Sequence, residues 1–96
     1  MNSNTLEFTG TLADAQSGGM TIIDIRDPVT ARQQPLKVEC VNMTAEQLIN
    51  NTSQIPTDKP VLLVCYGGFS SLNLTRQLRA MGFDNIYSKL GGANST

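Results

Sequence analysis

The chain has 96 residues, of which 40% are hydrophobic and 16% are charged, and its formal net charge is -1. This length suits one domain with a modest core, and the composition is that of a soluble globular protein rather than a disordered or fibrous one. The seven basic residues are scattered among acidic ones. Nucleic acid is therefore not an expected partner, because a phosphate backbone requires a clustered cationic surface.

The first ten residues, MNSNTLEFTG, lack the basic start and apolar core of a signal peptide. No apolar run approaches the length that spans a membrane, so we expect a cytoplasmic protein without a membrane partner. The sequence has two cysteines, Cys40 and Cys65, and no histidine. This composition excludes Cys–His catalysis and the usual zinc ligand sets, and an intracellular setting favours two thiols over a disulfide.

The first half of the chain predicts short helices and strands in alternation. Thr11 can cap the first helix, which Gly18 and Gly19 end, and Thr44 can cap the second. The β-branched stretch before Pro28 is typical of a buried strand. In chain order we expect a helix over 11–18, a strand over 21–27, a weaker strand over 38–43 and a helix over 44–51.

The second half begins with the clearest strand. The run VLLVCY at 61–66 is apolar and continuous, which predicts the centre of a parallel sheet covered on both faces. From Ser71 the apolar period changes to i, i+4, i+7. The resulting amphipathic helix is expected to bury Leu74, Leu78 and Met81.

Gly82 is expected to end that helix in the left-handed conformation. Phe83 would then pack on Leu78, as in a Schellman motif. A last strand is predicted over residues 85–90, before a turn at Gly91–Gly92. Strands that alternate with helices predict an α/β fold with right-handed crossovers.

Cys65 lies where the apolar strand stops and a loop begins. Ligands bind at the carboxyl ends of the strands in such a sheet. The loop runs into a helix N-terminus, whose free N–H groups and dipole favour a thiolate. Gly67 and Gly68 would allow successive backbone amides to converge on the sulfur. A thiolate held in this way needs no histidine base.

The order of strand, Cys-x-x-Gly-x-x-Ser, amphipathic helix, Gly-Phe, strand and Leu-Gly-Gly resembles a rhodanese (sulfurtransferase) domain. Upstream, IIDIRDP at 22–28 is similar to the Ile-Asp-x-Arg segment of the family, and CVNM at 40–43 is similar to its small-x-Asn-Ile strand. The resemblance covers nearly the whole chain. The downstream motif is carried by Cys65, Gly68, Ser71, Gly82, Phe83, Leu90, Gly91 and Gly92.

The resemblance implies a rhodanese-like α/β fold with a central, mainly parallel sheet of about five short strands and helices on both faces. It also implies that Cys65 takes a sulfane sulfur from a donor, holds it as a persulfide and passes it to a thiol or cyanide acceptor. No metal or organic cofactor is implied. The loop that would bind the substrate and the persulfide consists of Tyr66, Gly67, Gly68, Phe69, Ser70 and Ser71.

The sequence departs from the family pattern in three places. The Gly-His-Ile segment is absent near residues 35–37, and many members continue past Gly-Gly into a last helix. We expect a single domain over residues 1–96, either minimal or cut short after Thr96. The loop also lacks the basic residue found in many members. Thiosulfate is therefore expected to be a weak donor, and a polysulfide or a protein or low-molecular-weight persulfide a better one.

Other functions share some of these features. A non-catalytic rhodanese-like module would dock a protein partner through the same face, and a redox-sensing thiol would form a sulfenic acid or mixed disulfide. Phosphatase activity is not expected, because Ser71 stands where related phosphatases place the arginine that clamps the phosphoryl group.

Four further residues have two interpretations each. Asp24 and Arg26 could support the site at the carboxyl edge, but we favour a structural role, with the carboxylate bound to backbone amides and the arginine paired with a carboxylate. Cys40 is expected at a small core position on its strand, and a role as resolving thiol is the alternative. Tyr66 and Phe69 either shape a partly apolar mouth or pack under the loop.

Overall fold

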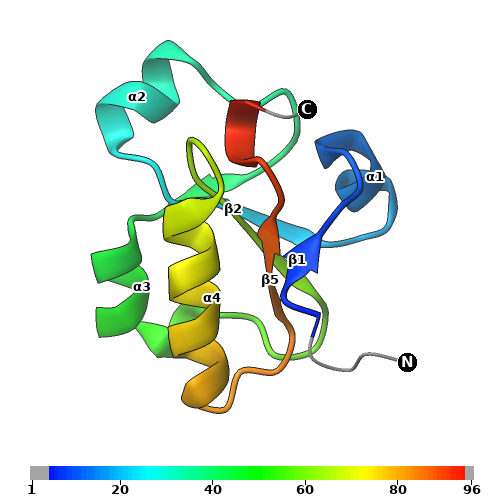
Figure 1. Cartoon of the computed structure of the whole chain (residues 1–96). Helices are drawn as coiled ribbons and strands as arrows, with labels where there is room; N and C mark the ends of the chain where they lie inside the picture. The colour runs from blue at the N-terminus through cyan, green and yellow to red at the C-terminus, as the bar shows by residue number, and fades with distance from the viewer. Residues whose placement is uncertain (1–4, 95–96) are drawn as a thin grey trace.

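Five parallel strands form one sheet with helices on both faces in the computed structural model, which describes residues 5–94 (Figure 1). The strands are β1 (Glu7–Phe8), β2 (Thr21–Asp24), β3 (Val41–Asn42), β4 (Val61–Val64) and β5 (Ile86–Lys89), in the spatial order β1-β5-β4-β2-β3. The helices are α1 (Leu12–Ser17), α2 (Pro28–Gln33), α3 (Ala45–Asn50) and α4 (Phe69–Ala80), with short 3-10 turns η1 (Thr52–Gln54) and η2 (Gly92–Asn94).

Strand β4 is the central strand, as its apolar run predicts, and all four of its residues are fully buried. Val61 and Leu63 join an apolar cluster with residues of α3 and α4, whereas Leu62 and Val64 join another with residues of α1. Figure 1 shows these helices on opposite faces of the sheet. Each fully buried side chain of this kind contributes about 1.5–3 kcal/mol. The carboxyl end of β4 is thus held firmly from both sides.

The predicted helices at 11–18 and 44–51 are confirmed as α1 and α3. Thr11 and Thr44 cap them, each in a reciprocal capping box with the residue three positions on. The predicted strands at 21–27 and 38–43 are shorter than expected, since β2 ends at Asp24 and β3 contains only two residues.

Strand β1 and helix α2 were not predicted. Strand β1 has two residues, and α2 has six, none of them buried, so neither produces an apolar period. Asp27 caps α2 through a bond from the Thr30 amide, and Pro28 lies at its first turn. The N-cap and the proline therefore define the start of α2, although none of its side chains packs in the core.

Helix α4 begins at Phe69, two residues before the predicted start. Leu74 and Leu78 are buried as expected, but the prediction for Met81 was wrong, because this residue is the C-cap and is 52% exposed. Gly82 has φ +104, and Phe83 N donates to Leu78 O at 3.0 Å. The Schellman motif is therefore confirmed.

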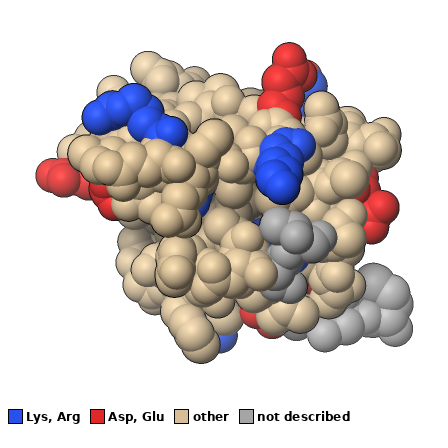
Figure 2. All heavy atoms as spheres, turned by 90° about the horizontal axis from the view of Figure 1, so that it is seen from above, with Lys and Arg blue, Asp and Glu red and all other residues tan. Residues whose placement is uncertain are grey.

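The carboxyl ends of the strands share one edge of the sheet, which is uppermost in Figure 1. Figure 2 looks down on this face, where the charged side chains are few and spaced apart. No helix within residues 5–94 combines the length and apolar character needed to cross a membrane.

Candidate active site

Cys65 directly follows β4 at the carboxyl edge of the sheet, where the sequence predicts it. Its side chain lies in the apolar cluster beneath α4 and is 6% exposed. The backbone hydrogen bonding between β2 and β4 continues one residue past the end of β2, since Ile25 N donates to Val64 O at 2.8 Å. The thiol is therefore placed by the most deeply buried strand of the molecule and by its neighbour β2.

Two backbone amides donate to the Cys65 sulfur, and the Ser71 hydroxyl accepts from the thiol and can donate to the thiolate. The Gly68 amide lies 3.1 Å from Sγ, and both the amide and the hydroxyl of Ser71 lie 3.3 Å from it. Gly68 has φ +97, which L side chains rarely adopt, and this conformation turns the first turn of α4 toward the thiol. Gly67 does not have a positive φ, so only one of the two predicted glycines is required for the anion cradle.

The pKa of Cys65 is set by two opposing effects. Burial raises the pKa of the thiol, but hydrogen bonds from the Ser71 side chain and from the amides of Ser71, Gly68 and Ser70 lower it further than burial raises it. The net result is a pKa below the ordinary value of a cysteine. A larger fraction of Cys65 is thus in the nucleophilic thiolate form at neutral pH.

Ser71 is connected to a second buried hydroxyl, which sequence reasoning did not identify. Ser88 Oγ on β5 lies 2.7 Å from Ser71 Oγ, and neither residue is exposed to solvent. When Ser88 donates to Ser71, the Ser71 hydroxyl is free to donate to the sulfur. The available signal was that Ser88 is two positions after the apolar Ile86, and therefore on the same face of the strand.

The turn after β5 lies against the loop. Ala93 N donates to Cys65 O at 2.7 Å, and Asn94 N donates to Tyr66 O at 3.3 Å. A Cβ added to Gly68 would lie 3.0 Å from Gly91 N. The predicted turn at Gly91–Gly92 therefore approaches the loop closely and fixes the backbone that carries the thiol.

A hollow of about 460 Å³ opens beside Cys65, and we call it the thiol hollow. Helix α2, Tyr66 and Ser70 form its rim. Tyr66 is 58% exposed and shapes the mouth, which was one of the two expectations for it. Phe69 is 85% exposed and does not line the hollow, so it neither shapes the mouth nor packs under the loop. The lining residues are Ile25, Arg26, Asp27, Thr30, Gln34, Cys65, Tyr66 and Ser70.

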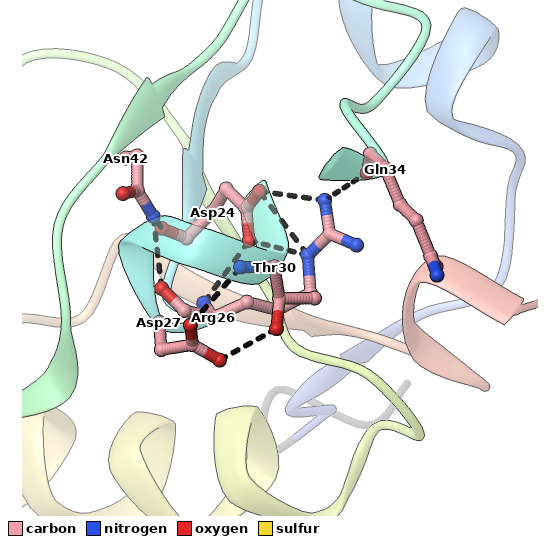
Figure 3. A network of polar contacts seen from close by, with 6 residues as sticks. All are labelled: Asp24, Arg26, Asp27, Thr30, Gln34 and Asn42. Carbon is pink, nitrogen blue, oxygen red and sulfur yellow. Dashed lines mark hydrogen bonds and ion pairs between the residues drawn. The ribbon is translucent and has the colours of Figure 1, made fainter. Parts of the chain in front are cut away.

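Asp24 and Arg26 form a buried ion pair at the floor of this region (Figure 3). Arg26 Nη2 lies 2.9 Å from Asp24 Oδ2, and Nε donates to both carboxylate oxygens. The Asp24 carboxylate also accepts the Arg26 amide, and Arg26 Nη2 donates to Gln34 O at 2.7 Å. Asn42 Nδ2 donates to the carbonyls of Asp24 and Arg26. This is the structural arrangement that the sequence favours, and it ties α2 to β2 and β3.

Cys40 does not occupy the expected core position. It precedes β3 and is exposed, because this two-residue edge strand is itself exposed at both positions. Burial raises the pKa of its thiol, the Asp24 charge raises it further, and the Arg26 charge lowers it. Both cysteines are free thiols, as expected, and they line different hollows. Within residues 5–94, no cluster of His, Cys, Asp or Glu side chains could hold a metal ion.

The contact between the Ser71 and Ser88 hydroxyls predicts how the pKa of Cys65 depends on Ser88. Replacing Ser88 with alanine removes the hydroxyl that can donate to Ser71 while Ser71 donates to the thiolate, so the Ser71 hydroxyl should stabilise the Cys65 thiolate less well. One neutral hydrogen bond contributes about 1 kcal/mol, so the midpoint of the pH profile for alkylation by iodoacetamide should rise by roughly half a pH unit to one.

Thr75→Val provides the control, because Thr75 Oγ1 is buried on α4, as Ser71 is, and has no hydrogen-bond partner within residues 5–94. This variant should leave the alkylation profile unchanged. If Ser88→Ala moves the midpoint no further than Thr75→Val does, the hydroxyl pair has no influence on the thiolate.

The comparisons with known proteins agree with the geometry. A family model described as Rhodanese-like domain matches residues 9–95. The thiosulfate sulfurtransferase GlpE of Shewanella oneidensis is 34% identical over 77 residues, which cover 80% of this chain and 75% of that protein. GlpE of Vibrio cholerae is also 34% identical, over 71 residues that cover 74% of this chain and 66% of that protein.

Solved structures share the fold. A rhodanese homologue from Thermus thermophilus superimposes with a TM-score of 0.70 at 27% identity, covering 88% of this chain and 92% of that chain. A rhodanese-related protein from Thermoplasma volcanium has a TM-score of 0.73 at 22% identity, covering 88% and 84% of the two chains. The second likeness is evidence for the fold alone.

Proposed function

The chain belongs to the rhodanese-like domain family, and from that premise we propose that Cys65 is the residue that carries a sulfane sulfur as a persulfide. The activity is sulfur transfer, for which the curated relatives are named. The observation that carries the assignment is the position of the Cys65 sulfur, which faces the amides of Gly68 and Ser71 and the Ser71 hydroxyl at the edge of an open hollow.

The reaction has two displacement steps. The Cys65 thiolate attacks the outer sulfur of a donor, the S–S bond of the donor breaks, and the leaving group takes the electron pair. Cys65 then holds the sulfur as a persulfide, whose anionic form the Gly68 and Ser71 donors stabilise. An acceptor thiolate or cyanide attacks the outer sulfur in the second step, and the Cys65 thiolate is released.

The donor is proposed to be a polysulfide or a persulfide, with a thiol or cyanide as acceptor. Thiosulfate, after which the curated relatives are named, is proposed as a weaker donor. The support is that residues 65–71 include no cation and that Arg26, the basic residue lining the thiol hollow, is already paired with Asp24. The thiol acceptor could be supplied by a small molecule or by a cysteine of a partner protein.

A reducing compartment fits this chemistry, because an oxidised Cys65 could not accept sulfur by this route. We therefore propose a cytoplasmic location. We also propose that residues 1–96 act as one domain, since the family model spans nearly all of them and the five described strands share one sheet.

Intact-mass spectrometry tests the assignment. The protein is incubated separately with polysulfide, thiosulfate and a low-molecular-weight persulfide, alongside Cys65→Ser and Cys40→Ser. The native protein and Cys40→Ser should each gain a sulfur that cyanide removes as thiocyanate, and Cys65→Ser should gain none. A Cys65 that alkylates readily yet accepts sulfur from no donor would contradict the proposal and favour a binding module.

A further inference from the structure

Two hollows meet at Arg26 on the carboxyl face of the sheet. One is the thiol hollow beside Cys65. The other, which we call the side hollow, has a volume of about 200 Å³ and lies between the segment after α2 and the turn η2. Arg26, Gln34 and Tyr66 line both hollows, so the two spaces adjoin.

Arg26 retains a nitrogen without a partner. Its Nε and Nη2 bind Asp24 and the Gln34 carbonyl, whereas Nη1 makes no hydrogen bond within residues 5–94. In Figure 3 this nitrogen carries no dashed line and points away from Asp24, toward the side chain of Gln34. The Arg26 side chain is only 4% exposed. Arg26 Nη1 is not one of the buried unpartnered atoms of residues 5–94, so it reaches the surface of the hollow, where an oxygen anion is its strongest acceptor.

The charges of the two hollows differ. The side hollow is lined by Arg26 and Lys37, and no Asp or Glu of residues 5–94 lines it. The thiol hollow is lined by Arg26 together with Asp27, whose carboxylate opposes an anion. The Arg26 charge is balanced by Asp24, so Lys37 supplies the net positive charge of the side hollow and Arg26 Nη1 supplies a hydrogen-bond donor. An anionic group is thus attracted to the side hollow and away from the thiol.

We propose that the side hollow binds the carboxylate of a short organic persulfide while the sulfane sulfur of the same molecule reaches Cys65. This inference rests on the proposed sulfur transfer and names the class of donor. Arg26 Nη1 and the Lys37 ammonium bind the carboxylate, and the hollow holds roughly half a dozen groups the size of a water molecule, at about 30 Å³ each. A short carboxylate arm fits, and a peptide-sized thiol does not.

The separation of the two groups is compatible with one small molecule. Asp24 pairs with Val64 across the sheet, and Ile25 N still bonds to Val64 O. Arg26 follows Ile25 directly, on a segment that runs beside Cys65 at about the 4.8 Å spacing of neighbouring strands. A chain of a few bonds is therefore enough to connect a carboxylate at Arg26 with a sulfur at Cys65.

The transfer step remains balanced. The Cys65 thiolate forms a new S–S bond to the outer sulfur of the donor, and the original S–S bond breaks. The carboxylate-bearing thiolate leaves with the electron pair, so Cys65 is oxidised to the persulfide and the inner sulfur of the donor is reduced to a thiolate. No other reactant is required.

The test compares two donors that differ only in charge, the persulfides of 3-mercaptopropionate and of 3-mercaptopropionamide. We expect the native protein to prefer the carboxylate. In Lys37→Glu the ratio of the two kcat/KM values should fall about five- to tenfold, because one attraction is replaced by a repulsion. Lys59→Glu makes the same change of charge beside the distant Cys40 hollow and should keep the native ratio within about twofold.

A binding measurement separates this inference from the proposed function. Butyrate is titrated into Cys65→Ser and followed by the NMR signals of Arg26 Nε–H and its neighbours. Saturable shifts that are lost on Lys37→Glu support the subsite even if neither persulfide transfers sulfur, which would count against the proposed function alone. An unchanged donor ratio in Lys37→Glu, or no butyrate response at Arg26, overturns the subsite.

Discussion

Gly92→Ala should destabilise the fold by about 2–5 kcal/mol and reduce sulfur transfer by about a hundredfold. An alanine Cβ at this position would lie 2.5 Å from Cys65 O, 2.6 Å from Tyr66 O and 2.7 Å from Gly68 N. These are backbone atoms of the loop that holds the thiol, so they cannot rotate away. The φ of +63 adds about 1–2 kcal/mol of backbone strain, and the overpacking adds about 1–3 kcal/mol.

The loss of activity follows from the same contacts. Relief of the clash requires the loop to move away from the turn at Gly92, which shifts the Gly68 amide relative to the sulfur. A displacement of about 1 Å at a reacting group can reduce the rate by about a hundredfold. Urea unfolding and the rate of thiocyanate formation measure the two effects separately.

Gly19→Ala is the matched control for Gly92→Ala. Gly19 has φ +80, but no atom of the described residues lies within 4 Å of an added Cβ, and the residue precedes β2 at the amino end of the sheet. This variant should lose about 1–2 kcal/mol from backbone strain alone and keep its sulfur transfer. If the two variants behave alike in both measurements, the close approach of the turn does not hold the loop in place.

The sequence was sufficient where the signals are local. The run at 61–66 has the composition of a doubly covered strand, and the observed strand β4, which ends at Val64 and not at Tyr66, places Cys65 at its carboxyl end. The Schellman end of α4 requires only Gly82 and an apolar residue after it, and both are present. Gly68 and Ser71 lie within one helical turn of the loop, so their approach to the sulfur depends on few intervening residues.

The rest of the site depends on contacts that no local pattern contains. Ser88 meets Ser71 across 17 positions of sequence, by way of the pairing of β5 with β4. Helix α2 forms one wall of the thiol hollow, but it buries no residue. Its sequence therefore has no apolar periodicity from which the helix could be predicted. Cys40 is next to the apolar Val41, which favours a buried strand. Whether a residue beside an edge strand is buried depends, however, on which other elements pack over it, and Cys40 is exposed.

Asp24→Asn should reduce the free energy of unfolding by about 3–5 kcal/mol, measured by urea denaturation. Both side chains of the Asp24–Arg26 pair are at most 4% exposed, and the substitution leaves the guanidinium buried without its counter-charge. The arginine cannot escape this cost by losing its proton, because a guanidinium stays protonated in proteins.

Two further variants identify the cause of that loss. Asp27→Asn makes the same chemical change at the exposed N-cap of α2, where asparagine caps about as well, and should cost less than about 1 kcal/mol. The double variant Asp24→Leu with Arg26→Met should recover much of the loss, because apolar residues of similar volume replace a buried ion pair at little cost. Equal losses for Asp24→Asn and Asp27→Asn would contradict the uncompensated charge as the cause, since the stability would then not depend on burial of the carboxylate.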